Sequence, residues 1–281
     1  MSGGEVDILA AIRQRVSVRS YEDRPVEPAL LDRLLDLADT AKHLTSVPPR
    51  VALLSGVERT RRVLTYMIGS YGLVQNPPHL LVGVLPEESG AARLDLGYVL
   101  EQVVLGATLM GMGTCWVTGS YDAQRAGRAV ELAAGEVAAA VCALGYPATD
   151  RWGRLHSRAV RWLAGGHRRK PLTEIVFSGR WGEPWSPEDA DQTLVTMLEH
   201  ARLSPSAHNY QPWRFIVRPD CLALALVRPA PIDAGIVMAH SSLASSALGR
   251  EGQWEVRLED AALAREFGLP QGVIPVAVFK R

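Results

Sequence analysis

Hydrophobic residues recur at helical spacing in two well-separated parts of the chain. Residues 28–42 carry leucine or alanine every three or four positions, and residues 194–204 repeat that spacing. This period is typical of a helix that buries one face. Residues 94–110 are apolar almost throughout, which predicts a long helix that is buried on most sides. A short helix is predicted over residues 7–14.

Short apolar segments between these helices predict strands. Aliphatic and β-branched residues fill 50–54, 80–85, 114–118 and 137–144, and a last segment of the same kind spans 273–279. Segments of this length and composition are typical of buried strands. Helices and strands therefore follow one another in mixed order, which predicts an α+β layer fold.

The two parts of the chain repeat one another. The apolar helix and the strand after it recur 138 positions later, as between Trp116 and Trp254, whereas the amphipathic helix recurs after 163 positions. Repetition in one order indicates an internal duplication. We therefore predict two tandem halves, 7–180 and 187–281, joined by a stretch rich in Gly, Trp and Pro. The first half has about 25 extra residues, which we place within 54–90.

Composition limits the possible partners and location. Lys and Arg number 30 together, as do Asp and Glu, so no net charge attracts nucleic acid or an anionic membrane. The three cysteines have no metal-ligand spacing and predict neither a disulfide framework nor a metal site. A cytoplasmic location is expected. The N-terminus lacks a signal-peptide pattern, and the apolar run at 103–112 is too short to span a bilayer.

An alternating motif follows the first predicted helix. In an extended chain, period two places Arg15, Ser17 and Arg19 on one face. Two guanidinium groups beside a hydroxyl suit a phosphate or the pyrimidine edge of a flavin. A solvated edge strand next to a helix is the alternative interpretation.

A polar loop lies between the amphipathic helix and the apolar strand of the second half. Ser206, Asn209 and Gln211 place a hydroxyl and two carboxamides within six residues. Each of these groups can donate and accept hydrogen bonds, so the loop suits the edge of a flat heterocycle. His208 lies in the same loop, either as a substrate contact or as an ordinary surface histidine.

Two weaker motifs complete the candidate chemistry. The glycines of 111–119 permit close approach of backbone to a ligand, although a helix cap followed by a turn explains them equally. The basic cluster 168–170 could bind a phosphate, or it could be a solvated turn. The sequence has no Gly-x-Ser-x-Gly elbow, no Gly-x-Gly-x-x-Gly fingerprint and no P-loop.

Taken in order, these motifs resemble those of the flavin-dependent nitroreductase family. They read Arg-x-Ser-x-Arg at 15–19, Gly-x-Gly-x-Cys-Trp at 111–116, Leu-Gly-Tyr-Pro at 144–147 and Pro-Ser-x-x-Asn-x-Gln-Pro-Trp at 205–213. The chain is most similar to the fused, double-length branch often called "putative TM nitroreductases". The resemblance implies a nitroreductase-like fold in which two tandem, diverged halves form an intrachain pseudo-dimer, so that a monomer suffices.

The resemblance also implies FMN as the cofactor and a site at the junction of the halves. The first-half counterpart of the polar loop, 42–50, has lost the Asn, Gln and Trp, so one FMN per chain is expected. The residues expected to bind it are Arg15, Val16, Ser17, Arg19, Thr118, Gly119, Arg168, Arg169, Pro205, Ser206, Asn209 and Gln211.

The activity implied by the resemblance is that of an FMN-dependent NAD(P)H oxidoreductase. Such an enzyme passes hydride from NAD(P)H through FMN to a small organic acceptor in a ping-pong cycle, and Arg15 or Arg19 is the candidate for stabilising the reduced flavin. No catalytic side chain is identified. Two alternatives stay open, namely an FMN-dependent oxidase or dehydrogenase of a small natural product, and a flavin-binding protein with a vestigial redox site.

Overall fold

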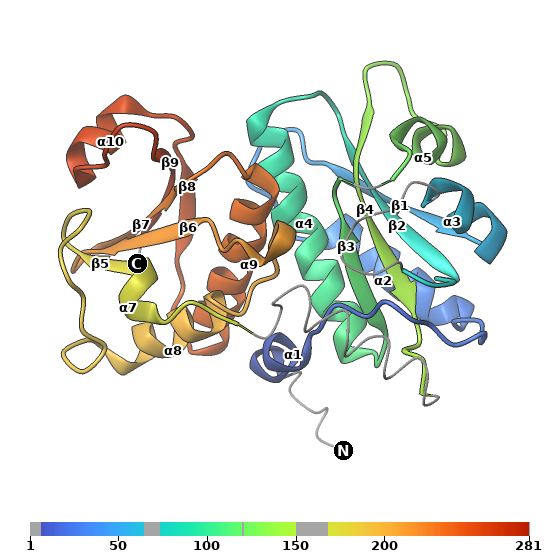
Figure 1. Cartoon of the computed structure of the whole chain (residues 1–281), viewed down its shortest axis with the longest axis horizontal. Helices are drawn as coiled ribbons and strands as arrows, with labels where there is room; N and C mark the ends of the chain where they lie inside the picture. The colour runs from blue at the N-terminus through green and yellow to red at the C-terminus, as the bar shows by residue number, and fades with distance from the viewer. Residues whose placement is uncertain (1–6, 65–73, 120, 150–167, 281) are drawn as a thin grey trace. The chain divides into compact units, whose positions relative to one another are not determined.

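The fold is taken from a computed structural model that describes residues 7–64, 74–119, 121–149 and 168–280 (Figure 1). The described residues form two compact units. One, here called the first unit, lies within Gln14–His167. The other, here called the second unit, combines Met1–Arg13 with Arg168–Arg281.

The first unit contains an antiparallel sheet. Its strand order is β1-β2-β4-β3, and each neighbouring pair is antiparallel. The described elements are α2 (Pro28–Thr40), β1 (Arg50–Ser55), α3 (Val57–Val63), β2 (His79–Leu85), α4 (Gly90–Leu109), β3 (Gly113–Val117), α5 (Ala123–Ala129) and β4 (Val137–Gly145).

The second unit repeats this order and adds one strand. Its sheet runs β5-β6-β7-β9-β8, in which β5 is parallel to β6 and the other neighbours are antiparallel. The described elements are α1 (Ile8–Gln14), α7 (Leu172–Ile175), β5 (Val176–Ser178), α8 (Gln192–Ala201), a 3-10 turn (Ala207–Asn209), β6 (Trp213–Val217), β7 (Cys221–Leu226), α9 (Pro231–Ala247), β8 (Gln253–Val256), α10 (Ala261–Phe267) and β9 (Ile274–Lys280).

These elements confirm the α+β prediction and fit an internal duplication. The order β1-β2-β4-β3 matches β6-β7-β9-β8, and α5 and α10 both begin after a capping aspartate, Asp122 and Asp260. Residues 56–78, which include α3, join β1 to β2, whereas residues 218–220 join β6 to β7. The extra residues of the first half thus lie within the predicted stretch; part of it, 65–73, is outside the described residues.

The compact units divide the chain differently from the predicted halves. The segment 168–178 precedes the predicted linker, yet β5 pairs with β6 and so belongs to the second unit. The linker stretch itself also lies inside that unit, where Trp185 is buried. The halves 7–180 and 187–281 describe a proposed ancestry and stay a prediction.

Helices cover both faces of the first unit's sheet (Figure 1). Leu80, Val82 and Val84 of β2 point into the core beneath α3 and α5. Gly83 faces the other way, where a Cβ atom would lie 2.6 Å from Leu96 of α4. The central strand β2 is therefore buried throughout, which explains its continuous apolar sequence. Among the described residues, no helix combines the length and hydropathy that a membrane span requires.

The start of α4 gives a first test of the fold. The Ser89 hydroxyl accepts a hydrogen bond from Ala92 N at 3.1 Å and caps the helix, which therefore begins before the apolar run. At the start of α9, Ala230 provides no side-chain cap. Ser89→Ala should lower the free energy of unfolding by about 1 kcal/mol, measured by urea denaturation. The control Ser246→Ala alters an exposed hydroxyl inside α9 and should cost nothing; an equal loss in both variants would contradict the cap.

Candidate functional site

The polar loop of the second unit has an unusual backbone. His208, Asn209 and Gln211 have φ angles of 51°, 54° and 50°. L-residues seldom adopt this left-handed region, and they stay there only when the surroundings hold them. Non-glycine strain of this kind clusters at functional sites.

A buried carboxylate and a hydroxyl hold the start of the loop. Both carboxylate oxygens of Asp233, in the first turn of α9, accept from Ala207 N, at 3.2 and 3.3 Å. Ser206 Oγ accepts from Gln211 N at 3.0 Å. Burial raises the pKa of Asp233 to about 6, although the hydrogen bond from Ala207 and the charge of Arg228 favour its ionised form.

The two carboxamides of the loop bind the basic segment that precedes α7. Asn209 Nδ2 donates to Arg168 O at 2.8 Å, and Gln211 Nε2 donates to the same carbonyl at 3.1 Å. Gln211 Oε1 accepts from Lys170 N at 2.8 Å. The sequence predicts that these amides face a heterocycle, and in the structure both of them hydrogen-bond to residues 168–170, while Gln211 Nε2 also donates to Asn209 O at 3.2 Å. Their position fixes the basic segment.

The guanidinium of Arg169 is also bound to the loop. Its Nη1 donates to Asn209 Oδ1 at 2.5 Å, and its Nη2 donates to Leu203 O at 3.0 Å. Arg168 is exposed, and Pro205 is half-buried at the start of the loop. The structure thus brings together the predicted residues of the second unit, which are Arg168, Arg169, Pro205, Ser206, Asn209 and Gln211.

In the first unit, the segment that contains Arg15 runs beside β3. Val18 N donates to Thr114 O at 2.8 Å. Arg15 is 8% exposed; its Nε lies 3.9 Å from a Glu101 carboxylate oxygen and has no hydrogen-bond partner among the described residues. A buried guanidinium N–H without an acceptor is costly unless a ligand or water completes it. Val16 is exposed.

Arg15, Ser17 and Arg19 all lie near the buried thiol of Cys115 and influence its pKa. Burial raises the pKa of Cys115, and the charges of Arg19 and Arg15 and a hydrogen bond with Ser17 oppose that rise. Thr118 and Gly119, the remaining predicted residues of this unit, form an exposed bend after β3.

Glu101 of α4 is a candidate site residue that the motifs did not reveal. Its carboxylate is buried, lies beside Arg15 and accepts from Trp116 Nε1 at 2.7 Å. An acidic residue in the middle of an apolar helix is expensive to bury unless it is paired, so its presence there was the available signal. Among the described residues, no cluster of His, Cys, Asp or Glu could hold a metal ion.

Comparison with known proteins gives the fold and the family. A crystal structure of a putative nitroreductase from Thermotoga maritima matches with a TM-score of 0.62 at 20% identity, covering 100% of this chain and 96% of that one, which shows a shared fold. A relative from Methanothermobacter thermautotrophicus, described as "Putative NADH dehydrogenase/NAD(P)H nitroreductase", is 28% identical over 157 residues, which are 52% of this chain and 80% of the relative.

The fold is therefore that of the nitroreductases. The family described as "Putative TM nitroreductase" matches residues 7–245, and the chain belongs to it. A further crystal structure, of a nitroreductase with bound FMN from Bacteroides fragilis, is 18% identical, covers 51% of this chain and 90% of that one, and has a TM-score of 0.42.

Proposed function

We propose that this protein is an FMN-dependent oxidoreductase that passes hydride from NAD(P)H to a small organic acceptor in a ping-pong cycle. The observation that carries the proposal is the fixed position of a basic segment, since Asn209 and Gln211 bind the backbone of residues 168–170 and Asn209 also binds Arg169. Family membership and the names of the relatives support the class of reaction.

The charged residues of the proposed site suit the two polar ends of FMN. The guanidinium groups of Arg168 and Arg169 are the proposed partners of its phosphate, because arginine forms charge-assisted pairs with phosphate oxygens. Arg15, Ser17 and Arg19 are the proposed partners of its pyrimidine edge. The buried Arg15 Nε, which has no hydrogen-bond partner among the described residues, supports a bound acceptor at that point.

When bound, FMN would supply the two-electron redox chemistry, and the protein would supply binding, orientation and charge. Arg15 would stabilise negative charge at the pyrimidine edge, because a fixed cation in a site with little water is worth more than one in solvent. Glu101 would keep the Arg15 side chain in place through their ion pair. Trp116 Nε1 in turn orients Glu101.

The proposal includes one FMN per chain, bound at an intrachain pseudo-dimer of a cytoplasmic monomer. Val16, Thr118, Gly119, Pro205 and Ser206 would contribute backbone and hydroxyl contacts. The first-half loop 42–50 has no Asn or Gln at the matching positions. A second complete site is therefore not expected.

An absorption spectrum of the purified protein tests the proposal. We expect the band of oxidised flavin, bleached by anaerobic NADH or NADPH and restored when a nitroaromatic or quinone acceptor is added. A protein that stays colourless after incubation with FMN would contradict the proposal. Substrate-driven oxygen consumption without NAD(P)H would instead favour an oxidase.

A further inference from the structure

A basic groove lies between α3 and α5 of the first unit. Its volume is about 580 Å³, and its lining residues are Arg59, Arg62, Val63, Arg125, Arg128 and Ala129. None of them belongs to the proposed FMN site, and α3 lies in the stretch without a counterpart in the second unit.

The helices explain why four arginines line one groove. Arg59 and Arg62 are three positions apart on α3, and Arg125 and Arg128 are three apart on α5, so each pair shares a helix face. Contacts between the helices fix these faces. Arg125 Nη1 donates to Arg62 O at 3.2 Å, and Arg59 Nη2 donates to Ala129 O at 3.5 Å.

The charge of the lining is strongly unbalanced. Four of its six lining residues are arginines and none is acidic, and the nearby Asp122 carboxylate lies 3.2 Å from Arg125 Nε. Glu58, the acidic residue of α3, pairs instead with Arg61, which does not line the groove. Each guanidinium has five N–H donors, so the recorded bonds of Arg59 and Arg125 leave further donors for a ligand.

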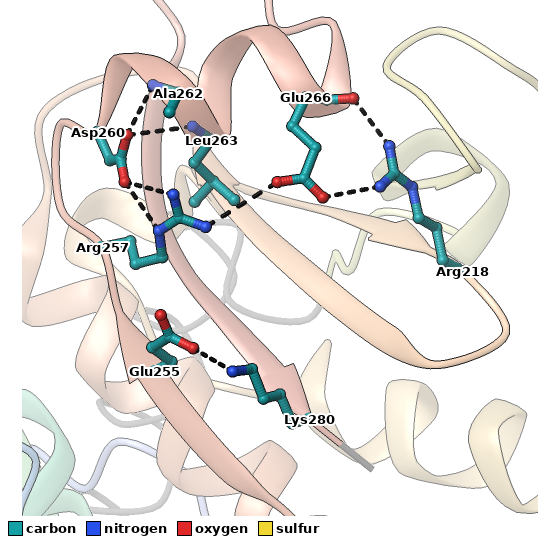
Figure 2. A network of polar contacts seen from close by, with 8 residues as sticks. All are labelled: Arg218, Glu255, Arg257, Asp260, Ala262, Leu263, Glu266 and Lys280. Carbon is teal, nitrogen blue, oxygen red and sulfur yellow. Dashed lines mark hydrogen bonds and ion pairs between the residues drawn. The ribbon is translucent and has the colours of Figure 1, made fainter.

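The second unit shows that this charge is not a requirement of the fold. In α10 the positions of Arg125 and Arg128 are taken by Leu263, which is buried, and Glu266. Figure 2 shows Glu266 between two arginines, 2.9 Å from Arg218 and 3.9 Å from Arg257. On the equivalent face of α10, one position is buried in apolar packing and the other carries a carboxylate that pairs with arginines. The face of α5, in contrast, lines an open groove and is basic.

We propose that the α3–α5 groove binds the phosphate groups of a small phosphorylated molecule. Its volume falls within the range of small-molecule sites. Arginine forks match phosphate oxygens in paired, charge-assisted hydrogen bonds. The chain as a whole has no net charge, so the excess of guanidinium groups is a local feature of this groove.

Titration calorimetry with inorganic pyrophosphate tests the proposal. The protein is first saturated with FMN, so that pyrophosphate does not compete at the proposed cofactor site. We expect binding that weakens with added salt and becomes at least about 10-fold weaker in Arg62→Gln/Arg128→Gln. The matched control is Arg61→Gln, which removes an arginine of the same helix that pairs with Glu58; its affinity should equal that of the wild type.

The result does not depend on the cofactor proposal. In the Arg169→Gln variant the groove is intact, so pyrophosphate should bind with unchanged affinity whether or not FMN binds. Thermal denaturation of each variant shows that it is folded. Absence of pyrophosphate binding, an equal loss in Arg61→Gln, or binding of heparin but not of pyrophosphate would overturn the proposal.

Discussion

Replacing Asn209 with alanine is expected to weaken FMN binding by about 10- to 100-fold. The substitution removes the acceptor of Arg169 Nη1 and the donor to Arg168 O, so the basic segment loses two of its attachments to the loop. A hydrogen bond to a charged group is worth about 1.5–3 kcal/mol, which corresponds to this range of affinity. The measurement is the dissociation constant of FMN, obtained by quenching of flavin fluorescence.

Asn76→Ala is the matched control. Asn76 also has a positive φ, 50°, and also accepts from an arginine, Arg61 at 3.1 Å, but it lies in the first unit and outside the predicted site. Its loss should leave FMN affinity unchanged. Full flavin retention by Asn209→Ala, or an equal loss in both variants, would contradict the role given to Asn209.

The elements of the fold were predictable because their apolar patterns are local. The helix of 28–42 and the strand of 137–144 are found as α2 and β4 with small changes at their ends. Pairing between distant segments is not encoded locally. Strand β5 is three residues long, and nothing in 176–178 indicates that it lies parallel to β6.

For the candidate site, the sequence indicates which side chains to consider but not what they contact. Polar side chains in the loop marked Asn209 and Gln211, yet a carboxamide serves a ligand or a backbone equally well. Only the fold brings the carbonyl of Arg168 to them. The same holds for the α3–α5 groove, because Arg62 and Arg128 are far apart in the sequence and meet through helix packing.

A comparison of the two units clarifies the role of Asp233. Its counterpart Asp95 accepts from Leu44 N at 2.7 Å and Thr45 N at 3.0 Å, just as Asp233 accepts from Ala207 N. In both units a carboxylate in the long helix holds the loop that follows the amphipathic helix. The same anchor lies beneath two loops of different sequence, so it supports the backbone of the loop.

Asp233→Asn is expected to make the protein more stable at neutral pH. Burial raises the pKa of Asp233 to about 6, above its unfolded value of about 3.9. Because folding raises this pKa, protonated Asp233 contributes to the free energy of unfolding. That contribution is fully present below about pH 4 and is lost as the pH rises through about 6. The lost amount is about 2–3 kcal/mol, at about 1.4 kcal/mol per pH unit. Asparagine keeps an acceptor for Ala207 N without the charge.

The free energy of unfolding, measured in urea at several pH values from 4 to 8, tests this expectation. The variant should match the wild type near pH 4 and exceed it by about 2–3 kcal/mol above pH 7. Asp260→Asn is the control with the opposite sign, because a hydrogen bond from Arg257 lowers the pKa of Asp260 and its contribution is lost as the pH falls. That variant should be less stable than the wild type at neutral pH. A difference between Asp233→Asn and the wild type that does not change with pH would contradict a raised pKa, and would mean that the hydrogen bond from Ala207 and the charge of Arg228 offset the cost of burial.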